Sequence, residues 1–507
     1  MGLASKAIGL TWWGSNLPGD RAFRKALRNP QSCQERLLHQ YLRRNADTAF
    51  GKRHGFASIR SVAEYQERVP LSDYDGHAPW FDRAAAGEAN VLTRDPVRHF
   101  ALSSGSTRAA KQIPYTSTLQ EEFRRAVAPW MVDLFRTRPD LALGPSYWSI
   151  SPVAREATRT AGGVPVGFEE DSAYLGGIWK RLVDGMMAVP SEVRHIQDLE
   201  AFRHATVLHL LRCRELRILS VWHPSFLELL LESLERDWDR LLSKLDGRRQ
   251  AELSRLGPRD YSGIWPRLGL ISCWGDGHAA LGLNGLRQRF PSVTVQPKGL
   301  IATEAFVTLP YAGQMPIALR SHFFEFLDEV GRPRLVHQLE SGREYSVVAT
   351  TGGGLYRYKL EDRVQVTGFL NATPSLRFLG KEDHVSDLRG EKLSEGFVAL
   401  AQRDVFARHG LSPAFALLAP AEACDRYALF IESDQNLPDR LAVDLDEALQ
   451  ENPHYRYCRD LGQLAPVDAV RIPEGGYRRY VERCRALGQR IGDIKATALS
   501  RIPGGPS

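Results

Sequence analysis

The stretch LGLISCWGDGHAALGLNGLRQRFPSVTVQ, Leu268–Gln296, decides the fold class of this 507-residue chain. An apolar run, Leu268–Trp274, ends at a Gly-Asp-Gly turn. A segment reaching Phe290 separates it from a second apolar run, Val293–Gln296. Short apolar runs of this kind are typical of strands that are buried on both faces. A strand, a helix and a second strand in succession therefore predict a sheet with helices on both of its faces.

The segments on either side continue this pattern. Leu216–Trp222 is expected to be another buried strand, and Pro224 and Ser225 open a helix behind it. Ala205–Leu211 fits either a helix or a strand. A helix is also expected after Thr118, because Glu121 three places on completes a capping box. Further expected elements are helices at Gln34–Ala49 and Val62–Val69, and strands at His99–Leu102, Leu300–Thr303, Tyr345–Thr351 and Val364–Leu370.

A change in character near Phe378–Asp383 predicts a domain boundary. The chain is too long for one compact core, so at least two domains are expected. Beyond the boundary, strands are expected at Ala414–Leu418 and Tyr427–Ile431, with helices at Leu441–Gln450 and Tyr477–Gly488. We therefore predict an α/β protein. A large N-terminal domain, residues 1–380, has β-sheets covered by helices, and a smaller mobile α+β domain spans residues 381–507.

The composition is that of an ordinary globular protein, with 43% hydrophobic and 25% charged residues. The net charge of +6 comes from 66 basic and 60 acidic residues that are scattered, so no nucleic-acid partner is expected. An apolar run of about 18 residues is absent from the sequence, so no membrane span is predicted. Six widely spaced cysteines without a C-x-x-C pair favour free thiols and a cytoplasmic location.

One motif follows the expected strand at His99–Leu102. In ALSSGSTRAAKQIPYT, Ala101–Thr116, hydroxyl-bearing residues and a glycine crowd Ser103–Thr107, and Lys111 follows. A strand that runs into such a turn presents backbone N–H groups and hydroxyls that suit phosphate oxygens. The pattern differs from the standard P-loop. On its own, a polar surface turn beside a lysine explains the stretch equally well.

Three further stretches carry acidic or hinge residues. In PKGLIATEAFVTLP, Glu304 lies where a strand meets a turn, and could hold a divalent cation that bridges nucleotide phosphates. In GGGLYRYKLEDRVQVTGF, Asp362 is expected in a loop between two strands, where it could accept from both hydroxyls of a ribose, with Arg357 as an anion partner. A surface glutamate and a hairpin ion pair are the simpler alternatives. In FLGKEDHVSDLRGEKLSEGFV, Gly380 followed by charged residues is typical of a hinge.

These stretches, in this order, resemble the Gretchen Hagen family, the auxin-responsive acyl acid–amido synthetases. That family is similar to the wider adenylate-forming superfamily of acyl-CoA synthetases and luciferase. The resemblance covers nearly the whole chain and is most specific in Ile271–Ala305 and Gly354–Asp362. Tyr65–Gly76 also resembles the family's segment before the phosphate loop.

The resemblance implies roles for particular residues. Those that would hold the ATP phosphates are Ser103, Ser104, Gly105, Ser106, Thr107 and Lys111. Thr303 would lie near the α-phosphate and Glu304 near Mg²⁺. The third motif supplies nucleotide-binding Tyr356, Arg357 and Asp362, with Asp362 on the ribose. Lys381 matches the hinge position, and Lys495, in GDIKATALSR, would be the mobile lysine that reaches the α-phosphate.

The chain departs from the family's pattern at three places. Arg108-Ala109-Ala110 stands where a second glycine is usual, Glu361 replaces a glycine before Asp362, and Ala496-Thr497 stands where a proline is common. A carboxylate beside a ribose contact could weaken nucleotide binding or simply point to solvent. A catalytically degenerate, nucleotide-binding homologue is therefore an open alternative.

The activity implied is that of an ATP-dependent acyl acid–amido synthetase, which adenylates a carboxylic acid and transfers the acyl group to an amine, expected to be an amino acid. ATP and Mg²⁺ are the implied cofactors, and a monomer is expected. A thioester with coenzyme A or a carrier is the alternative product. Trp222, His223 and Trp274 flank apolar strands where the acyl group should lie, although core aromatics would look the same.

Overall fold

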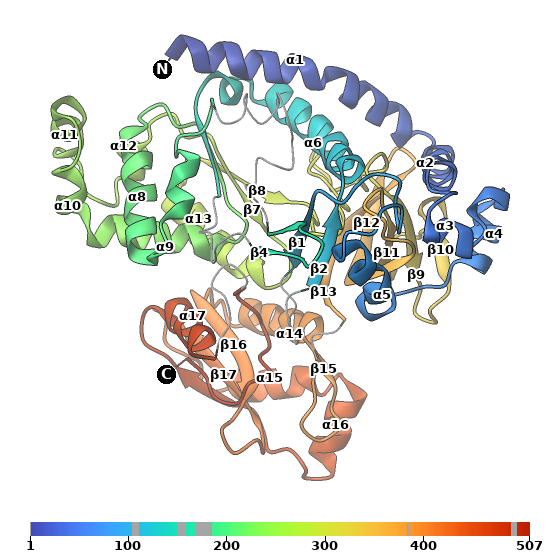
Figure 1. The fold of residues 1–507 in the computed structure, drawn as a ribbon. Coiled ribbons are helices and arrows are strands. Elements are labelled where there is room, and N and C mark those ends of the chain that lie inside the picture. The colour runs from blue at the N-terminus through green and yellow to red at the C-terminus, as the bar shows by residue number, and fades with distance from the viewer. Residues whose placement is uncertain are drawn as a thin grey trace.

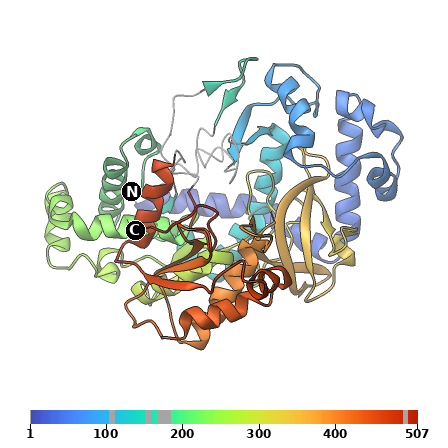
Figure 2. The same cartoon turned by 90° about the horizontal axis from the view of Figure 1, so that it is seen from below.

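The computed structural model describes residues 2–103, 111–149, 158–167, 185–382, 385–487 and 494–506. A large N-terminal part holds several sheets and most of the helices, and a smaller C-terminal part, orange to red, lies below it (Figure 1). Seen from below, the C-terminal part lies in front of the larger part (Figure 2). The predicted α/β class, with a large and a smaller part, is confirmed.

The stretch Leu268–Gln296 supplies an inner strand and an edge strand of a parallel sheet. Its strand order is β3–β6–β7–β8, and each neighbouring pair is parallel. The strands are β3 (Ser146–Trp148), β6 (Ile218–Ser220), β7 (Leu270–Trp274) and β8 (Thr294–Lys298). The strands predicted around β6, β7 and β8 are confirmed, with bounds that differ by a few residues.

Helices cover both faces of this sheet, as predicted. On one face, Leu219 and Ile271 share a core with α8 (Leu199–Arg212), α9 (Pro224–Arg236) and α13 (Ala280–Arg289). On the other face, Ile218 and Leu270 share a core with α1 and α6. These helices span α1 (Gly2–Leu27) and α6 (Ser117–Thr137), and α1 lies across the top of the molecule in Figure 1. The ambiguous segment 205–211 is therefore helical.

An antiparallel sheet lies beside the parallel one, in the order β10–β9–β11–β12–β13. Its strands are β9 (Phe323–Leu327), β10 (Pro333–Leu335), β11 (Glu344–Thr350), β12 (Tyr358–Leu370) and β13 (Thr373–Lys381). The two strands predicted here, β11 and β12, are confirmed. However, β12 begins at Tyr358, six residues earlier than expected at Val364, and so includes Asp362.

A third sheet, β2–β1–β5–β4, contains the strands on either side of the hydroxyl-rich segment. β1 (His99–Ser103) and β2 (Lys111–Tyr115) pair antiparallel with Ser103 opposite Lys111, so residues 104–110 join the two strands. The sheet is completed by β4 (Thr158–Arg159) and β5 (Pro165–Val166). Further helices of the N-terminal part are α2 (Pro30–Arg44), α3 (Ala49–Arg53), α4 (Val62–Arg68), α5 (Tyr74–Ala85), α10 (Trp238–Leu242), α11 (Gly247–Leu253) and α12 (Tyr261–Ile264).

Two local expectations are wrong. The cap of α6 is Thr116, whose side chain accepts from the Leu119 N–H at 3.2 Å, whereas Thr118 lies inside the helix and donates to Asp95. The segment expected as a strand at 300–303 forms only an isolated bridge between Ile301 and Phe306, because the chain turns between them.

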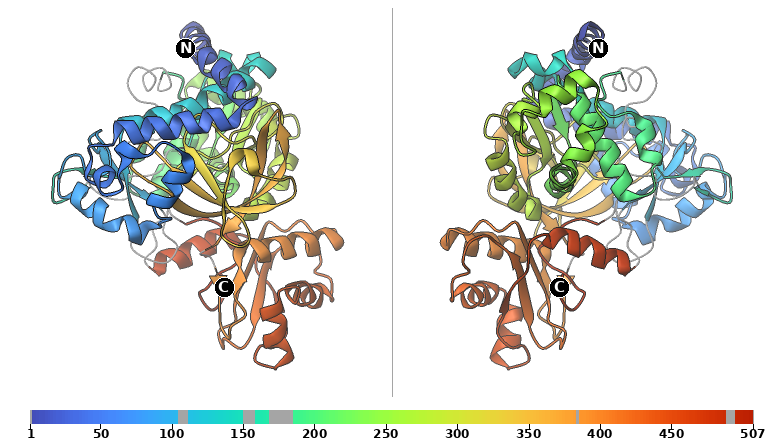
Figure 3. Two further views of the ribbon diagram at one scale, coloured as in Figure 1. Left: turned by 90° about the vertical axis from the view of Figure 1, so that its right-hand side faces the viewer. Right: turned by 90° about the vertical axis from the view of Figure 1, so that its left-hand side faces the viewer.

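The C-terminal part is a sheet in the order β16–β17–β18, packed against helices. Its elements are β14 (Val385–Ser386), β15 (Leu393–Ser394), α14 (Glu395–Arg408), β16 (Phe415–Pro420), β17 (Tyr427–Glu432), α15 (Leu441–Leu449), α16 (Pro453–Asp460), β18 (Asp468–Arg471) and α17 (Gly476–Ala486). Both strands and both helices predicted here are confirmed. This part projects below the larger one in both views of Figure 3.

Candidate functional site

Asp362 lies at a β-bulge, not in the loop that was expected. The register between β11 and β12 shifts between Ser346 and Val348, and Glu361 has a positive φ of 60° within the shifted segment. Such a bulge re-aims neighbouring side chains. Asp362 is only 2% exposed, and its Oδ1 lies 2.9 Å from Nζ of Lys381, its partner residue on β13. The ribose and hinge candidates are therefore in direct contact.

Charged groups from separate segments meet around Asp362. Burial raises the pKa of Asp362 and the Glu304 carboxylate adds to that rise, while the ammonium groups of Lys381 and Lys495 oppose it. The Asp362 Oδ2 atom is buried and has no hydrogen-bond partner among the described residues. A buried acceptor without a donor fits the hydroxyl of a bound ribose.

The turn that carries Thr303 and Glu304 is held at its far end. The Ala302 N–H donates to the Ala305 carbonyl at 2.9 Å, which closes the turn, and both site residues are half-buried. The Phe306 N–H donates to Nε2 of His322 at 3.0 Å, and Ser321 Oγ donates to the Phe306 carbonyl at 2.9 Å. Glu304 is therefore presented by a short turn whose end is fixed.

Lys111 opens β2, directly after the hydroxyl-rich loop. Its Nζ lies 3.6 Å from Oε2 of Glu361, the residue that departs from the family's pattern. The added carboxylate thus contacts the lysine expected to neutralise phosphate charge. Ser103 ends β1 opposite Lys111. The other predicted loop residues, Ser104, Gly105, Ser106 and Thr107, lie outside the described residues, as do Arg108, Ala109 and Ala110.

The contacts of Tyr356 and Arg357 tie both side chains to the core. The Tyr356 hydroxyl donates to the Leu92 carbonyl at 2.8 Å, and its ring stacks on Phe50 with centroids 4.7 Å apart. Arg357 donates from Nε and Nη2 to the two carboxylate oxygens of Glu325, each at 3.0 Å. These contacts brace the chain that leads into β12. The nucleotide-binding role expected of these two residues stays a prediction.

An apolar pocket of about 80 Å³ opens at the carboxyl ends of the parallel strands, which is where ligands bind in open α/β sheets. Its lining residues are Phe123, Val127, Trp130, Trp148, Ser149, Ser220, Trp222, Lys298, Ile301 and Phe306. Of the predicted pocket residues, this set includes Trp222 but neither His223 nor Trp274. The spacing of Phe123, Val127 and Trp130 on α6 was the available sequence signal.

His223 and Trp274 have other contacts. The His223 Nδ1 accepts from the Ser225 N–H at 3.3 Å and so caps α9, while its ring stacks on Tyr477 of α17 with centroids 6.3 Å apart. The Trp274 ring packs against Trp222, with centroids 5.6 Å apart. The Trp274 ring also contacts Lys495, whose Nζ lies 4.8 Å from the ring centroid. The C-terminal part thus brings Lys495 to this edge of the sheet.

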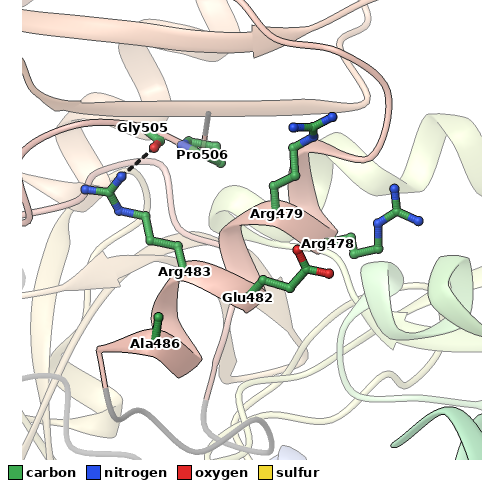
Figure 4. Close-up of a pocket in the computed structure, with 7 residues that line it drawn as sticks. All are labelled: Arg478, Arg479, Glu482, Arg483, Ala486, Gly505 and Pro506. Atoms are coloured by element: carbon green, nitrogen blue, oxygen red, sulfur yellow. Dashed lines mark hydrogen bonds between the residues drawn. The ribbon is translucent and has the colours of Figure 1, made fainter.

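A larger hollow of about 560 Å³ lies on the C-terminal part, along α17. Figure 4 shows that the guanidinium groups of Arg478, Arg479 and Arg483 point in different directions. Arg483 donates to the Gly505 carbonyl at 2.6 Å. The hollow is lined by none of the predicted site residues.

The fold is one that solved ligases share. The structure resembles that of 2-hydroxyisobutyryl-CoA ligase in the postadenylation state in complex with R3-HIB-AMP, with a TM-score of 0.53, 12% identity, and 94% and 91% of the two chains covered. The family models called GH3 family N-terminal, central and C-terminal domain match residues 20–255, 315–381 and 401–503. Because they cover more than half of the chain, the protein belongs to the GH3 family. The predicted family resemblance is confirmed.

Relatives named as amido or amino acid synthetases match nearly the whole chain. Indole-3-acetic acid-amido synthetase GH3.8 of Oryza sativa subsp. indica is 24% identical, with 94% of this chain and 89% of that protein covered. Jasmonoyl–L-amino acid synthetase JAR6 of Nicotiana attenuata is 22% identical, with 93% and 91% covered. The structure of AtGH3.15 acyl acid amido synthetase in complex with 2,4-DB matches with a TM-score of 0.81, 18% identity, and 95% and 93% covered.

No helix among the described residues is long and apolar enough to cross a membrane.

Proposed function

We propose that this protein is an ATP-dependent acyl acid–amido synthetase that adenylates a carboxylic acid and transfers the acyl group to an amine, expected to be an amino acid. One observation carries the proposal: the buried Asp362 carboxylate lies 2.9 Å from Nζ of Lys381. The charges of Glu304 and Lys495 also influence its pKa, and the turn of Glu304 lies between Ile301 and Phe306, which line the apolar pocket. The names of the relatives, which are amido and amino acid synthetases, support a carboxylic acid and an amino acid as the proposed substrates.

In the first half-reaction, a carboxylate oxygen of the acid attacks the α-phosphorus of ATP, and the bond to the pyrophosphate oxygen breaks. The barrier is largely one of bringing two anions together, so positioning and charge neutralisation supply the catalysis. Asp362 holds the ribose hydroxyls, Lys111 and the loop at residues 103–107 hold the outer phosphates, and Thr303 lies near the α-phosphate. Lys495 supplies a positive charge at that phosphate.

Glu304 is the residue proposed to hold Mg²⁺. No group of three or more histidine, cysteine, aspartate or glutamate side chains among the described residues could bind a metal alone. Mg²⁺ commonly takes one or two carboxylates and completes its shell with water and substrate phosphates, so Glu304 suits an ion that arrives with ATP. When bound, the ion would neutralise charge that develops on the phosphates.

In the second half-reaction, the amine nitrogen attacks the acyl carbon, loses a proton, and AMP leaves. We place the domain boundary between residues 380 and 381 and propose that residues 381–507 rotate between the two halves. A Cβ at Gly380 would lie 2.8 Å from the Cα of Gly396 on α14, so the backbones meet there without side chains. Lys381 joins this point to Asp362.

The pocket favours an acid with one compact apolar ring. Aromatic side chains from α6, β3, the segment after β6 and the turn after β8 line it, and its volume of about 80 Å³ favours a small acyl group. The protein is proposed to act as a monomer in the cytoplasm. Its cysteines, which are all free thiols, are compatible with a reducing compartment.

Product analysis tests the proposed function. The protein would be incubated with ATP, Mg²⁺ and monocyclic aromatic or aliphatic acids, with amino acids in one arm and coenzyme A in another. We expect AMP and an acyl–amino acid amide, identified by mass spectrometry, only when acid and amine are both present. AMP and a thioester in the coenzyme A arm alone would instead support the acyl-CoA ligase alternative. Binding of ATP without any product would support a degenerate homologue.

A further inference from the structure

A buried carboxylate links the segments that carry the nucleotide motifs. Glu122, on α6, and His322, just before β9, are both 0% exposed. The Glu122 Oε1 accepts from the Tyr41 hydroxyl at 2.6 Å, and Oε2 accepts from Nδ1 of His322 at 3.0 Å. The Gly352 N–H donates to both oxygens, at 3.1 and 2.9 Å. A carboxylate buried this deeply is normally retained only where each neighbour is a donor.

Gly352 and Phe306 each form hydrogen bonds through both the backbone N–H and the backbone carbonyl in this region. The Gly352 N–H is bound by Glu122, and its carbonyl accepts from Oγ1 of Thr116, the cap of α6, at 2.9 Å. The Phe306 N–H is bound by Nε2 of His322, and its carbonyl accepts from Ser321. Gly352 begins the segment that leads to Asp362. Phe306 ends the turn of Glu304 and lines the apolar pocket.

The network also fixes the proton on His322. Its Nε2 accepts from the Phe306 N–H, so that nitrogen carries no proton, and Nδ1 must be the donor to Glu122. Glu122 thereby selects the tautomer that can hold Phe306. A carboxylate that orients an imidazole in this way is a recurrent positioning device.

We propose that Glu122 and His322 are positioning residues for the reaction, which tie the turn of Glu304 and the wall of the acid pocket to the segment leading to Asp362. The inference rests on the proposed function. Neither side chain touches the substrates; each acts through a backbone group. Because α6 follows the phosphate loop and β2, one buried carboxylate sets the relative placement of the separate nucleotide motifs.

Two substitutions at His322 separate positioning from simple stability. Asparagine can place a donor near the position of Nδ1 and keep the bond to Glu122, but it cannot reach Phe306. Glutamine can place an acceptor near the position of Nε2 and keep Phe306, but it gives up Glu122. Tyr41→Phe is the matched control, because it removes a different bond to the same Glu122 carboxylate.

Acid-dependent ATP–pyrophosphate exchange is the functional readout. We expect His322→Asn to lower kcat/KM by about 100-fold, the scale of a misplaced catalytic group, and His322→Gln by about tenfold or less. Tyr41→Phe should stay close to wild type. Losses that simply follow the fall in melting temperature of each variant, or an Asn variant as active as the Gln variant, would overturn the proposal.

Amide hydrogen exchange gives a second readout that needs no activity. Exchange at Phe306 should quicken in His322→Asn but not in His322→Gln, and exchange at Gly352 should stay slow in both. Unchanged exchange at Phe306 in the Asn variant would contradict the link.

If both His322 variants fail to fold, Ser321→Ala replaces them, since it removes the other bond to Phe306 and should raise exchange in the same turn. A folded wild-type protein without pyrophosphate exchange would reject the proposed function. Hydrogen exchange could then still show that His322 holds Phe306, but this contact would have no catalytic role, and the positioning proposal would be overturned as well.

Discussion

Asp362 and Lys381 form an ion pair of 2.9 Å between paired strands, at the place where the antiparallel sheet ends. The contact joins the carboxylate proposed to hold the ribose to the residue at the proposed domain boundary. Lys381 also donates to the Leu360 carbonyl at 2.8 Å, so its ammonium is anchored on both sides of the bulge. Nucleotide binding and domain orientation can therefore influence each other through this pair.

The pair predicts a pH effect on ATP binding. Burial raises the pKa of Asp362 and Lys381 lowers it, so Lys381→Met should raise that pKa further. Because the ionised carboxylate accepts the ribose hydroxyls, the loss of ATP affinity on acidification should begin at higher pH in the variant. Calorimetric measurement of ATP affinity for both proteins over a series of pH values, from acidic to neutral, would show this shift. Asp362→Asn should bind ATP weakly at every pH. Superimposable profiles for wild type and Lys381→Met would contradict the coupling.

Replacing Glu361 should improve nucleotide binding. The carboxylate lies 3.6 Å from Lys111 and competes with phosphate for that ammonium, and Glu361 occupies a positive φ of 60° that glycine adopts more readily. Glu361→Gly should therefore tighten ATP binding by roughly twofold to fivefold, the scale of a partly solvated charge contact. Glu361→Gln is the matched control, since it removes the charge but keeps the side chain at positive φ. Weaker ATP binding by both variants would mean that Glu361 supports the site.

The sequence predicted the sheet at Leu268–Gln296 and the order of the motifs, because apolar runs and turn residues are local signals. It misplaced Asp362, since a bulge depends on how two strands pair and leaves no mark in one strand alone. It also missed Glu122 and His322. A charged residue on an amphipathic helix normally faces solvent, and only the tertiary structure brings Tyr41, Gly352 and His322 to that carboxylate. Arg357 matched a motif, but its partner Glu325 is distant in sequence.

Glu228 on α9 should make stability depend on pH. Burial raises the pKa of Glu228 to about 7; Arg289 opposes this rise, while Glu232 and Glu432 add to it. A folded-state pKa above the unfolded value means that the folded protein holds a proton which the unfolded chain releases. The stabilisation is complete below about pH 4.5 and is lost as pH rises toward 7. At pH 8, Glu228→Gln should thus be more stable than wild type, by roughly 1–3 kcal/mol in the free energy of unfolding. Its melting temperature should be correspondingly higher. The two proteins should converge at pH 4, and an equal offset at both pH values would count against this origin.

The pocket beside Trp222 should set the size of the acid. Val127 faces it from α6, so Val127→Phe would fill space that an aromatic ring needs, while Val127→Ile adds a single methylene group. We expect Val127→Phe to lose turnover with ring-bearing acids and to keep short aliphatic acids, with little change in ATP binding. Val127→Ile should retain most activity. Initial rates over a graded series of acids would check this, and unaltered preference in Val127→Phe would place the acid elsewhere.

Carboxylate-dependent ATP–pyrophosphate exchange tests the central claim most directly, because it reports adenylation alone. It would be measured with Mg²⁺ over aromatic and aliphatic acids, in wild type and in Glu304→Ala. The proposed chemistry predicts exchange with at least one acid and its loss, by about 100-fold or more, in the variant. A folded wild-type protein that binds ATP but exchanges with no acid would contradict the account, as would a Glu304→Ala variant that exchanges as fast as wild type.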